Sequence, residues 1–214
     1  MIRRIPLFPL PGVVLLPGAF LPLHIFEPRY RAMVADALLD EKTIGMAMLK
    51  PGSEQAGTTA PEIFPIGGAG RIIASESLSD GRYDIVLEGV FRYRVLEESP
   101  PSPYRIARVE EIQSIPFPTH AEARRVSEEA ISLFSEISGA LSLPPLPEET
   151  LSPERLGSEL ALRLRFEPSE LQELLETDSL ATRLDALIKR MQEWQGRIRL
   201  LSPFRRPGLD PSKN

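Results

Sequence analysis

Prolines set the strongest limit on the first thirty residues of this 214-residue chain. Six of its 22 prolines stand between Pro6 and Pro28. Each proline fixes φ and lacks a backbone N–H, so a long helix cannot run through this segment. Branched and aromatic residues at 13–16 and 20–26, which follow Pro-Gly pairs, predict two short strands.

A helix and further strands are expected next. Pro28 suits a first helical turn, and one helical face then carries Tyr30, Met33, Val34, Ala37 and Leu38. Strand patterns follow at 43–49, 63–75, 83–88, 91–97 and 104–112, with Asp80-Gly81 and Glu88-Gly89 as expected hairpin turns. Strands at this spacing, with one early helix, predict a small curled sheet or a partly open barrel.

The pattern changes to helical spacing after Pro116-Phe117-Pro118. Thr119 and Glu122 form a potential capping box, and an apolar stripe follows at Val126, Ala130, Leu133, Phe134 and Ile137. The proline-rich segment 143–147 breaks this helix. A second is expected from Ser152-Pro153-Glu154, with Leu156, Leu160 and Leu164 on one face, and a short third carries Leu171, Leu174 and Leu175.

The last expected helix has a heptad-like stripe, formed by Leu180, Leu184, Leu187, Met191, Trp194, Ile198 and Leu201. The stripe can join two chains in a coiled coil, or it can pack inward on its own bundle. We favour the bundle, with a homodimer as the alternative. The sequence thus predicts an α+β fold: a β-rich part with one inserted helix at 1–115, a helical bundle at 116–202 and a flexible tail at 203–214.

Composition narrows the class of protein. The chain has no cysteine, which excludes disulfides, thiolate metal sites and cysteine nucleophiles. It has no run of apolar residues long enough for a membrane span and no signal-peptide pattern, so we expect a cytoplasmic protein without a membrane partner.

Charge argues against nucleic acid as a partner. Residues 1–113 carry 12 basic and 14 acidic side chains, and residues 114–214 carry 13 and 16. Neither half offers the clustered Lys and Arg that neutralise phosphates.

Several of these segments resemble the N-terminal domain of Lon proteases. The resemblance rests on Ile5–Gly18, Leu21–Arg31, Gly67–Ile73, Asp80–Gly89, Phe91–Val95 and, more weakly, Glu170–Glu176 with Arg183-Leu184. It extends over about residues 3–202. The resemblance implies a β-rich pseudo-barrel similar to PUA domains, followed by helices. It also implies a stand-alone protein of this kind that binds unfolded or tagged polypeptides, as an adaptor working with protease or chaperone components.

Motifs for catalysis are sparse. There is no Gly-x-x-x-x-Gly-Lys-Ser/Thr loop for nucleotide phosphates, and no segment matches the Ser-Lys protease part of the family. His24 and His120 are the only histidines, and we expect His24 half-buried beside Phe26 and His120 near solvent. Glu27 is expected to cap the helix at Pro28, and Arg29 to pair with a carboxylate.

The glycine-rich run Gly67-Gly68-x-Gly70 is not followed by a helix pattern, which favours a bulge or a close strand approach over a phosphate site. The sequence therefore predicts no catalytic, cofactor-binding or metal-binding residue.

Binding is therefore the expected activity, and exposed apolar surface its expected means. Candidate material lies in the proline-rich segments 6–22 and 143–147 and in Phe8, Phe20, Phe64, Phe117 and Trp194, although the sequence singles out none of them. Two alternatives remain: RNA binding through the PUA-like part, and a small-molecule binder or hydrolase that uses His24 and nearby carboxylates.

Overall fold

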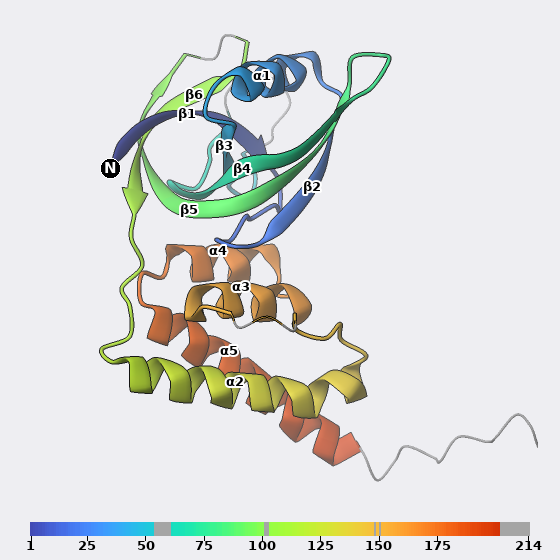
Figure 1. The fold of residues 1–214 in the computed structure, drawn as a ribbon, viewed down its shortest axis with the longest axis vertical. Helices are drawn as coiled ribbons and strands as arrows, with labels where there is room; N and C mark the ends of the chain where they lie inside the picture. The colour runs from blue at the N-terminus through green and yellow to red at the C-terminus, as the bar shows by residue number, and fades with distance from the viewer. Residues whose placement is uncertain (54–60, 101–102, 148, 150, 202–214) are drawn as a thin grey trace, which may run out of the picture.

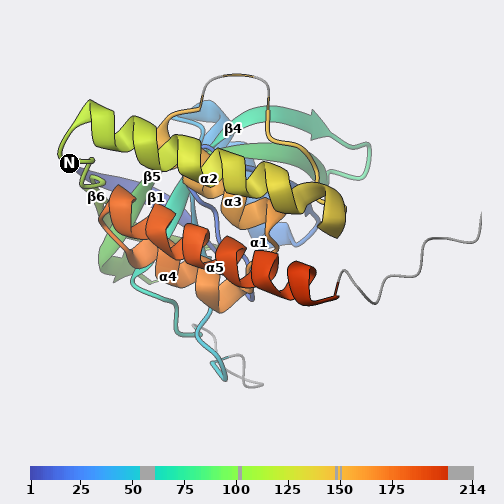
Figure 2. The same cartoon turned by 90° about the horizontal axis from the view of Figure 1, so that it is seen from below.

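A computed structural model describes residues 1–53, 61–100, 103–147, 149 and 151–201 (Figures 1 and 2). The predicted tail at 203–214 lies outside these residues. The strands are β1 (Ile2–Leu10), β2 (Phe20–Ile25), β3 (Thr43–Met48), β4 (Ile66–Ser77), β5 (Tyr83–Ser99) and β6 (Arg105–Ile112). The helices are α1 (Pro28–Leu39), α2 (His120–Leu141), α3 (Pro153–Arg163), α4 (Pro168–Glu176) and α5 (Leu180–Leu201). The predicted α+β class is confirmed.

The six strands form one sheet that closes on itself. Their order is β2-β5-β4-β3-β1-β6, and β5 also pairs with β6. Only β1 and β3 are parallel; the other pairs are antiparallel. Figure 1 shows α1 at one end of this barrel and the helices α2–α5 at the other.

Part of the sheet extends beyond the closed barrel. The pairing of β3 with β4 ends at Arg71, and the pairing of β6 with β5 begins at Arg92. Apart from the Ile72 N–H, which donates to the Lys42 carbonyl at 2.8 Å, residues 72–77 of β4 and 83–88 of β5 therefore pair with each other and, through β5, with β2. We call these three segments the sheet extension. A hairpin turn at Asp80-Gly81 joins two of them, as the sequence predicted, and Gly81 has a φ of 80°.

The start of the chain is one of two places where the strand predictions were wrong. β1 runs through Pro6 and Pro9, because it pairs with β6 over residues 2–7 and with β3 only over residues 7–10. Each proline thus has just one strand neighbour to satisfy. Residues 13–16, predicted as a strand, have no sheet partner. They cross the sheet instead, with Leu15 and Leu16 buried.

The Glu88-Gly89 hairpin prediction was also wrong, since β5 continues through it to Ser99. A Cβ on Gly89 would lie 2.1 Å from the carbonyl oxygen of Leu16. Gly68 is similar: a Cβ there would lie 1.8 Å from the carbonyl oxygen of Leu15. These glycines let the 13–16 segment pass close to the sheet. The sequence predicted a bulge or a close strand approach for the glycine-rich run: the register shift between Ala69 and Gly70 agrees with the first, and Gly68 against Leu15 with the second.

The helices follow their predicted patterns closely. Pro28 opens α1, and the Thr119 hydroxyl at the start of α2 accepts a 3.1 Å hydrogen bond from the Glu122 N–H. Glu27 occupies the N-cap position of α1, but its carboxylate does not cap the helix and pairs with Arg29 at 2.9 Å. In α5, the predicted stripe buries Leu184, Leu187 and Met191 within the chain, as the bundle interpretation requires.

Barrel and bundle share one hydrophobic cluster. It runs from Phe8, Leu16 and Leu87 of the β-rich part to Phe134, Leu160 and Leu187 of the helices. A smaller cluster inside the barrel includes Ile5, Leu7 and Tyr93. The division of the chain at residues 115–116 stays a prediction, because the main cluster is continuous across it.

Candidate functional site

One face of the sheet extension is largely exposed. Strand alternation places Phe20, Pro22 and His24 of β2 on this face, opposite Glu88, Val86 and Asp84 of β5. On the other side of β5, Ala74 and Glu76 of β4 pair with Val86 and Asp84, so their side chains lie on the same face. We call these eight residues the outer sheet face. The opposite face carries Leu21, Ile25, Ile72, Ile85 and Leu87, which are buried or partly buried in the main hydrophobic cluster.

Large apolar side chains stand on the outer sheet face and beside it. Phe20 is 47% exposed, Phe26 just beyond β2 is 62% exposed, and Ile73 at a β4 irregularity is 48% exposed. Among the described residues, Phe20 and Phe26 are the only exposed phenylalanines, and they stand at the two ends of β2. The two exposed rings, one at each end of the strand, are candidate contacts for a binding partner.

The surface of the extension is also hollowed. A shallow depression of about 630 Å³ is lined by residues 22–24 of β2, 74–76 of β4 and 84–86 of β5. It is continuous across all three strands. A depression of this kind can receive side chains of a bound segment, with apolar contacts from Pro22 and Val86.

His24 takes part in a hydrogen-bonded cluster at the edge of this depression. Its Nδ1 lies 2.6 Å from Asp84 Oδ1, and its Nε2 lies 3.1 Å from Arg82 Nη1. Because arginine only donates, Nε2 accepts and the ring proton sits on Nδ1, where it is donated to Asp84. Arg82 also pairs with Asp80, whose pKa is lowered chiefly by the backbone N–H of Arg82.

This arrangement does not favour the hydrolase alternative. A His–Asp pair can orient a general base, but the base needs its second nitrogen free to take a proton from a nucleophile. In His24 that nitrogen faces the guanidinium of Arg82. His120 is exposed at the start of α2, far from His24 in the sheet extension. The described residues contain no group of three His, Asp or Glu side chains placed to hold a metal ion.

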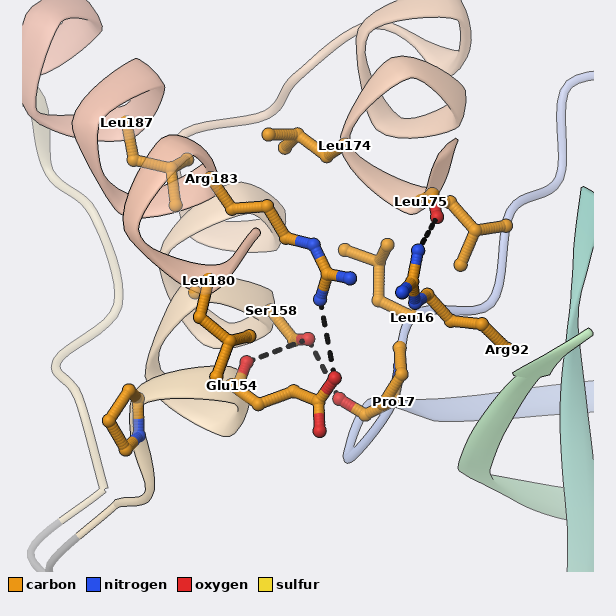
Figure 3. A pocket seen from close by; sticks show the side chains of 12 residues that line it. Leu16, Pro17, Arg92, Glu154, Ser158, Leu174, Leu175, Leu180, Arg183 and Leu187 are labelled. Atoms are coloured by element: carbon orange, nitrogen blue, oxygen red, sulfur yellow. Dashed lines mark hydrogen bonds and ion pairs between the residues drawn. The ribbon is translucent and has the colours of Figure 1, made fainter. Parts of the chain in front are cut away.

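The junction between barrel and bundle is held by a buried arginine (Figure 3). Arg92 of β5 is 1% exposed, and its Nη1 donates to the carbonyl oxygen of Leu175 at 2.8 Å and to Asp178 at 3.1 Å. It also donates to the Thr177 carbonyl. Its Nε is buried and has no partner among the described residues. Sequence reasoning gave Arg92 no role, because a buried arginine in a strand has no local signature.

A second arginine completes the junction. Arg183 of α5 donates to the Thr177 carbonyl at 2.6 Å, to Glu154 at 3.2 Å and to Ser114 at 3.1 Å. Burial, and then the nearby charge of Arg92, lowers its pKa. Ser158 of α3 donates to the Pro17 carbonyl at 2.7 Å, which adds a tie from the bundle to the 13–18 segment.

The junction encloses only about 10 Å³, between Leu16, Arg92, Ser158 and Arg183. That is room for about one water molecule. The junction is therefore structural: it fixes the bundle against the barrel, and it has no space for a ligand.

A polar hollow of about 200 Å³ lies on the other side of the barrel, between α1 and strands β1 and β6. Its lining includes Arg4, Asp36, Asp40, Lys42 and Tyr104. The Tyr104 hydroxyl donates to Asp36 at 2.7 Å, and burial followed by this bond raises the pKa of Tyr104 to about 12. No histidine lines this hollow, so it is separate from the hydrolase alternative, which uses His24.

The aromatic residues that the sequence offered as binding candidates differ in how exposed they are in the structure. Phe8 and Phe117 are buried, and Phe64 and Trp194 are partly buried. Among these candidates only Phe20 is exposed, at 47%. Sequence reasoning missed Ile73 and Val86 and treated Phe26 only as a neighbour of His24, with which it stacks at 6.3 Å between ring centres. Alternation along β2 could have placed Phe20, Pro22 and His24 on one face.

Comparison with known proteins gives one consistent family. Residues 4–193 match the family model described as the ATP-dependent protease La (LON) substrate-binding domain. A Lon protease of Anaeromyxobacter dehalogenans is 28% identical over 192 residues, and one of Dictyoglomus thermophilum is 31% identical over 187. These matches cover 86% and 84% of this chain but only 22% and 23% of the relatives.

Solved structures agree in fold. The Lon N-terminal domain protein from Xanthomonas campestris has a TM-score of 0.64 at 24% identity, and the match covers 87% of this chain and 98% of that one. The N-terminal domain of the Mycobacterium avium complex Lon protease has a TM-score of 0.63 at 16% identity, covering 89% and 98%. Within the described residues, no helix is long and apolar enough to cross a membrane. The match over residues 4–193 shows that this chain belongs to the family of Lon substrate-binding domains.

Proposed function

We propose that this protein binds unfolded or tagged polypeptide through the outer sheet face, without catalysing a reaction on it. The observation that carries the proposal is the exposure of Phe20 and Phe26 at the two ends of β2, beside the depression across the extension. Unfolded chains differ from folded ones chiefly in exposing apolar side chains and unpaired backbone. A strand-built surface with exposed apolar side chains among its polar ones complements both.

The family supports this substrate class, since its model describes a substrate-binding domain. The matched relatives are Lon proteases about four times longer than the aligned region, so their ATP-dependent proteolysis is not transferred to this chain. We propose that the protein acts in the cytoplasm as an adaptor in quality control, and that it hands bound polypeptide to a protease or chaperone.

The test is binding of an unfolded polypeptide to the purified protein. Reduced, carboxyamidomethylated α-lactalbumin serves as the probe, because it stays unfolded and its blocked thiols are neutral. Binding is measured by fluorescence anisotropy at low and high salt. We expect binding that persists at high salt, because burial of apolar surface is not screened.

Matched variants locate the surface. Phe26→Ala removes an exposed ring beside the outer sheet face, and Leu39→Ala removes a side chain that is 90% exposed at the end of α1. We expect Phe26→Ala to weaken binding at least fivefold and Leu39→Ala to leave it unchanged. Equal effects of the two substitutions would exclude the outer sheet face.

The RNA alternative is tested in parallel. Labelled single-stranded and duplex RNA replace the polypeptide under the same conditions. Tight RNA binding that weakens steeply with salt, together with no polypeptide binding, would overturn the proposal.

A further inference from the structure

The two free edges of the sheet extension differ in what they offer to an incoming strand. β2 forms one edge. The Gly89 N–H donates to the Ala19 carbonyl at 2.9 Å, so Ala19 and Gly89 form a hydrogen-bonded pair. Along an antiparallel ladder, hydrogen-bonded pairs alternate with pairs whose backbone groups point away from each other. Leu21, Leu23 and Ile25 thus bond to β5, whereas the backbone groups of Phe20, Pro22 and His24 face outward. Pro22 has no N–H, so this edge lacks its central donor.

The other edge, on β4, has no such block. The Leu78 N–H donates to the Arg82 carbonyl at 2.9 Å, so these two residues form a hydrogen-bonded pair. Every second pair along the ladder is of this kind, which makes Glu76 with Asp84 and Ala74 with Val86 hydrogen-bonded pairs as well. The N–H and C=O groups of Ser75 and Ser77 therefore face away from β5. β3 no longer pairs with β4 beyond Arg71, and among the described residues neither serine makes a backbone hydrogen bond outside the strand ladders.

This edge is also uncovered. Every residue from 73 to 77 is exposed, and none is proline. Sheet edges in folded proteins are usually shortened, charged, bulged or covered, because they pair readily with other chains. This edge carries a bulge between Ile72 and Ala74 and the charge of Glu76, but residues 74–77 beyond the bulge pair with β5 in regular register. Here Ser75 lines the depression across the extension, and Ser77 lies two residues further along the same edge.

We infer that the edge of β4 at residues 73–77 receives a segment of bound polypeptide as an additional strand. This rests on the proposed function and names the way in which it is carried out. Backbone hydrogen bonds to Ser75 and Ser77 would make the interaction tolerant of sequence, and alternate side chains of the segment would lie on the outer sheet face next to Ala74 and Glu76.

Charge on this face indicates which segments fit. Asp84 is paired with His24, but Glu76, directly across from Asp84, has no ion-pair partner among the described residues. A segment with an apolar side chain beside Ala74 and a lysine or arginine beside Glu76 would complement the surface. The preferred occupant is therefore an extended segment that carries apolar and basic side chains on one face.

The first test removes one outward donor. Ser75→Pro deletes the outward N–H without breaking the β4–β5 ladder, because Ser75 does not bond to β5. Ser75→Ala is the matched control, since it removes the hydroxyl and keeps the N–H. We expect Ser75→Pro to weaken binding of the unfolded probe at least tenfold and Ser75→Ala less than twofold, with both variants folded by circular dichroism.

A second measurement uses the peptide and does not depend on how Ser75→Pro folds. The probe is a Thr-Val-Thr-Lys repeat of about eight residues, compared with the same peptide N-methylated at every residue. Strand addition requires the amide donors, so methylation should weaken binding at least tenfold. Equal affinity of the two peptides would overturn the inference.

Charge reversal tests the preference for basic segments. Glu76→Lys should weaken binding of the lysine-containing peptide at least fivefold and reduce its salt dependence. Glu128→Lys changes the net charge equally at an exposed position on α2, and it should have no effect.

Failure of the inference can be told apart from failure of the proposed function. If the unmodified protein binds no unfolded chain, the proposed function fails. If it binds, and Phe26→Ala weakens binding while Ser75→Pro and N-methylation do not, the outer sheet face binds polypeptide and the β4 edge does not.

Discussion

Arg92 and Leu175 join the two halves of the molecule: the guanidinium of a fully buried strand residue donates to the last turn of α4 over 2.8 Å. The same side chain reaches Asp178 and the Thr177 carbonyl, and Arg183 reaches Thr177 from α5. Residues 175–178 thus receive donors from both the barrel and the bundle. The barrel and the bundle are therefore joined by specific polar contacts as well as by the shared apolar cluster.

Replacing Arg92 should destabilise the whole molecule. In Arg92→Met the Leu175 carbonyl loses its side-chain donor in a buried site, and we expect a loss of about 3 kcal/mol in the free energy of unfolding. Urea denaturation followed by circular dichroism measures it. Arg108→Met removes an arginine from an exposed pair with Glu97 and should cost no more than about 0.5 kcal/mol. Similar losses in the two variants would contradict the role given to Arg92.

The glycines under the 13–16 segment should tolerate no side chain. Gly68→Ala would place a Cβ 1.8 Å from the Leu15 carbonyl oxygen, so the backbone has to move and we expect a loss of about 2 kcal/mol or more. Gly196→Ala in α5 meets nothing within 4 Å. There, alanine should stabilise the helix by about 0.8 kcal/mol, because glycine is the poorer helix former. Thermal unfolding of both variants checks the opposite signs.

Buried tyrosine makes the fold sensitive to alkaline pH. Burial raises the pKa of Tyr93, whose hydroxyl donates to the Met46 carbonyl at 2.8 Å. A tyrosine pKa raised in the folded state contributes stability that is fully present below the unfolded value of about 10 and is lost as pH rises above it. We therefore expect the free energy of unfolding to fall above about pH 10.

Tyr93→Phe separates the two effects of that hydroxyl. At neutral pH it should cost about 1–2 kcal/mol, because the Met46 carbonyl loses its partner inside the barrel. Above about pH 10 the variant should lose stability less steeply than the unmodified protein. Urea titrations at pH 8 and pH 11 test both parts. If the variant and the unmodified protein lose the same free energy of unfolding between these two pH values, the alkaline loss comes from groups other than Tyr93.

Local signals predicted much of this fold. Pro28, the Thr119 cap and the stripes of α2, α3 and α5 depend on neighbours within a few residues, and the structure agrees with them. The errors at residues 13–16 and at Glu88-Gly89 have one common cause. Leu15 and Leu16 cross the sheet next to Gly68 and Gly89, and a contact between segments so distant in sequence leaves no local pattern.

The candidate site was predictable only in part. Phe20 was one of several aromatic residues named from the sequence, and its neighbours Val86 and Ala74 come from strands more than fifty residues away. Strand register brings them together, and register depends on the bulges at Ala69/Gly70 and Ile72/Ala74. The free edge of β4 could not be predicted from the sequence either, because it exists only where the pairing of β3 with β4 ends at Arg71.

The most direct test of the account is the affinity of the purified protein for reduced, carboxyamidomethylated α-lactalbumin, measured with and without Phe26→Ala at high salt. The account predicts binding that survives high salt and falls at least fivefold in the variant. No binding to the unfolded chain, or binding that Phe26→Ala leaves unchanged, would contradict it.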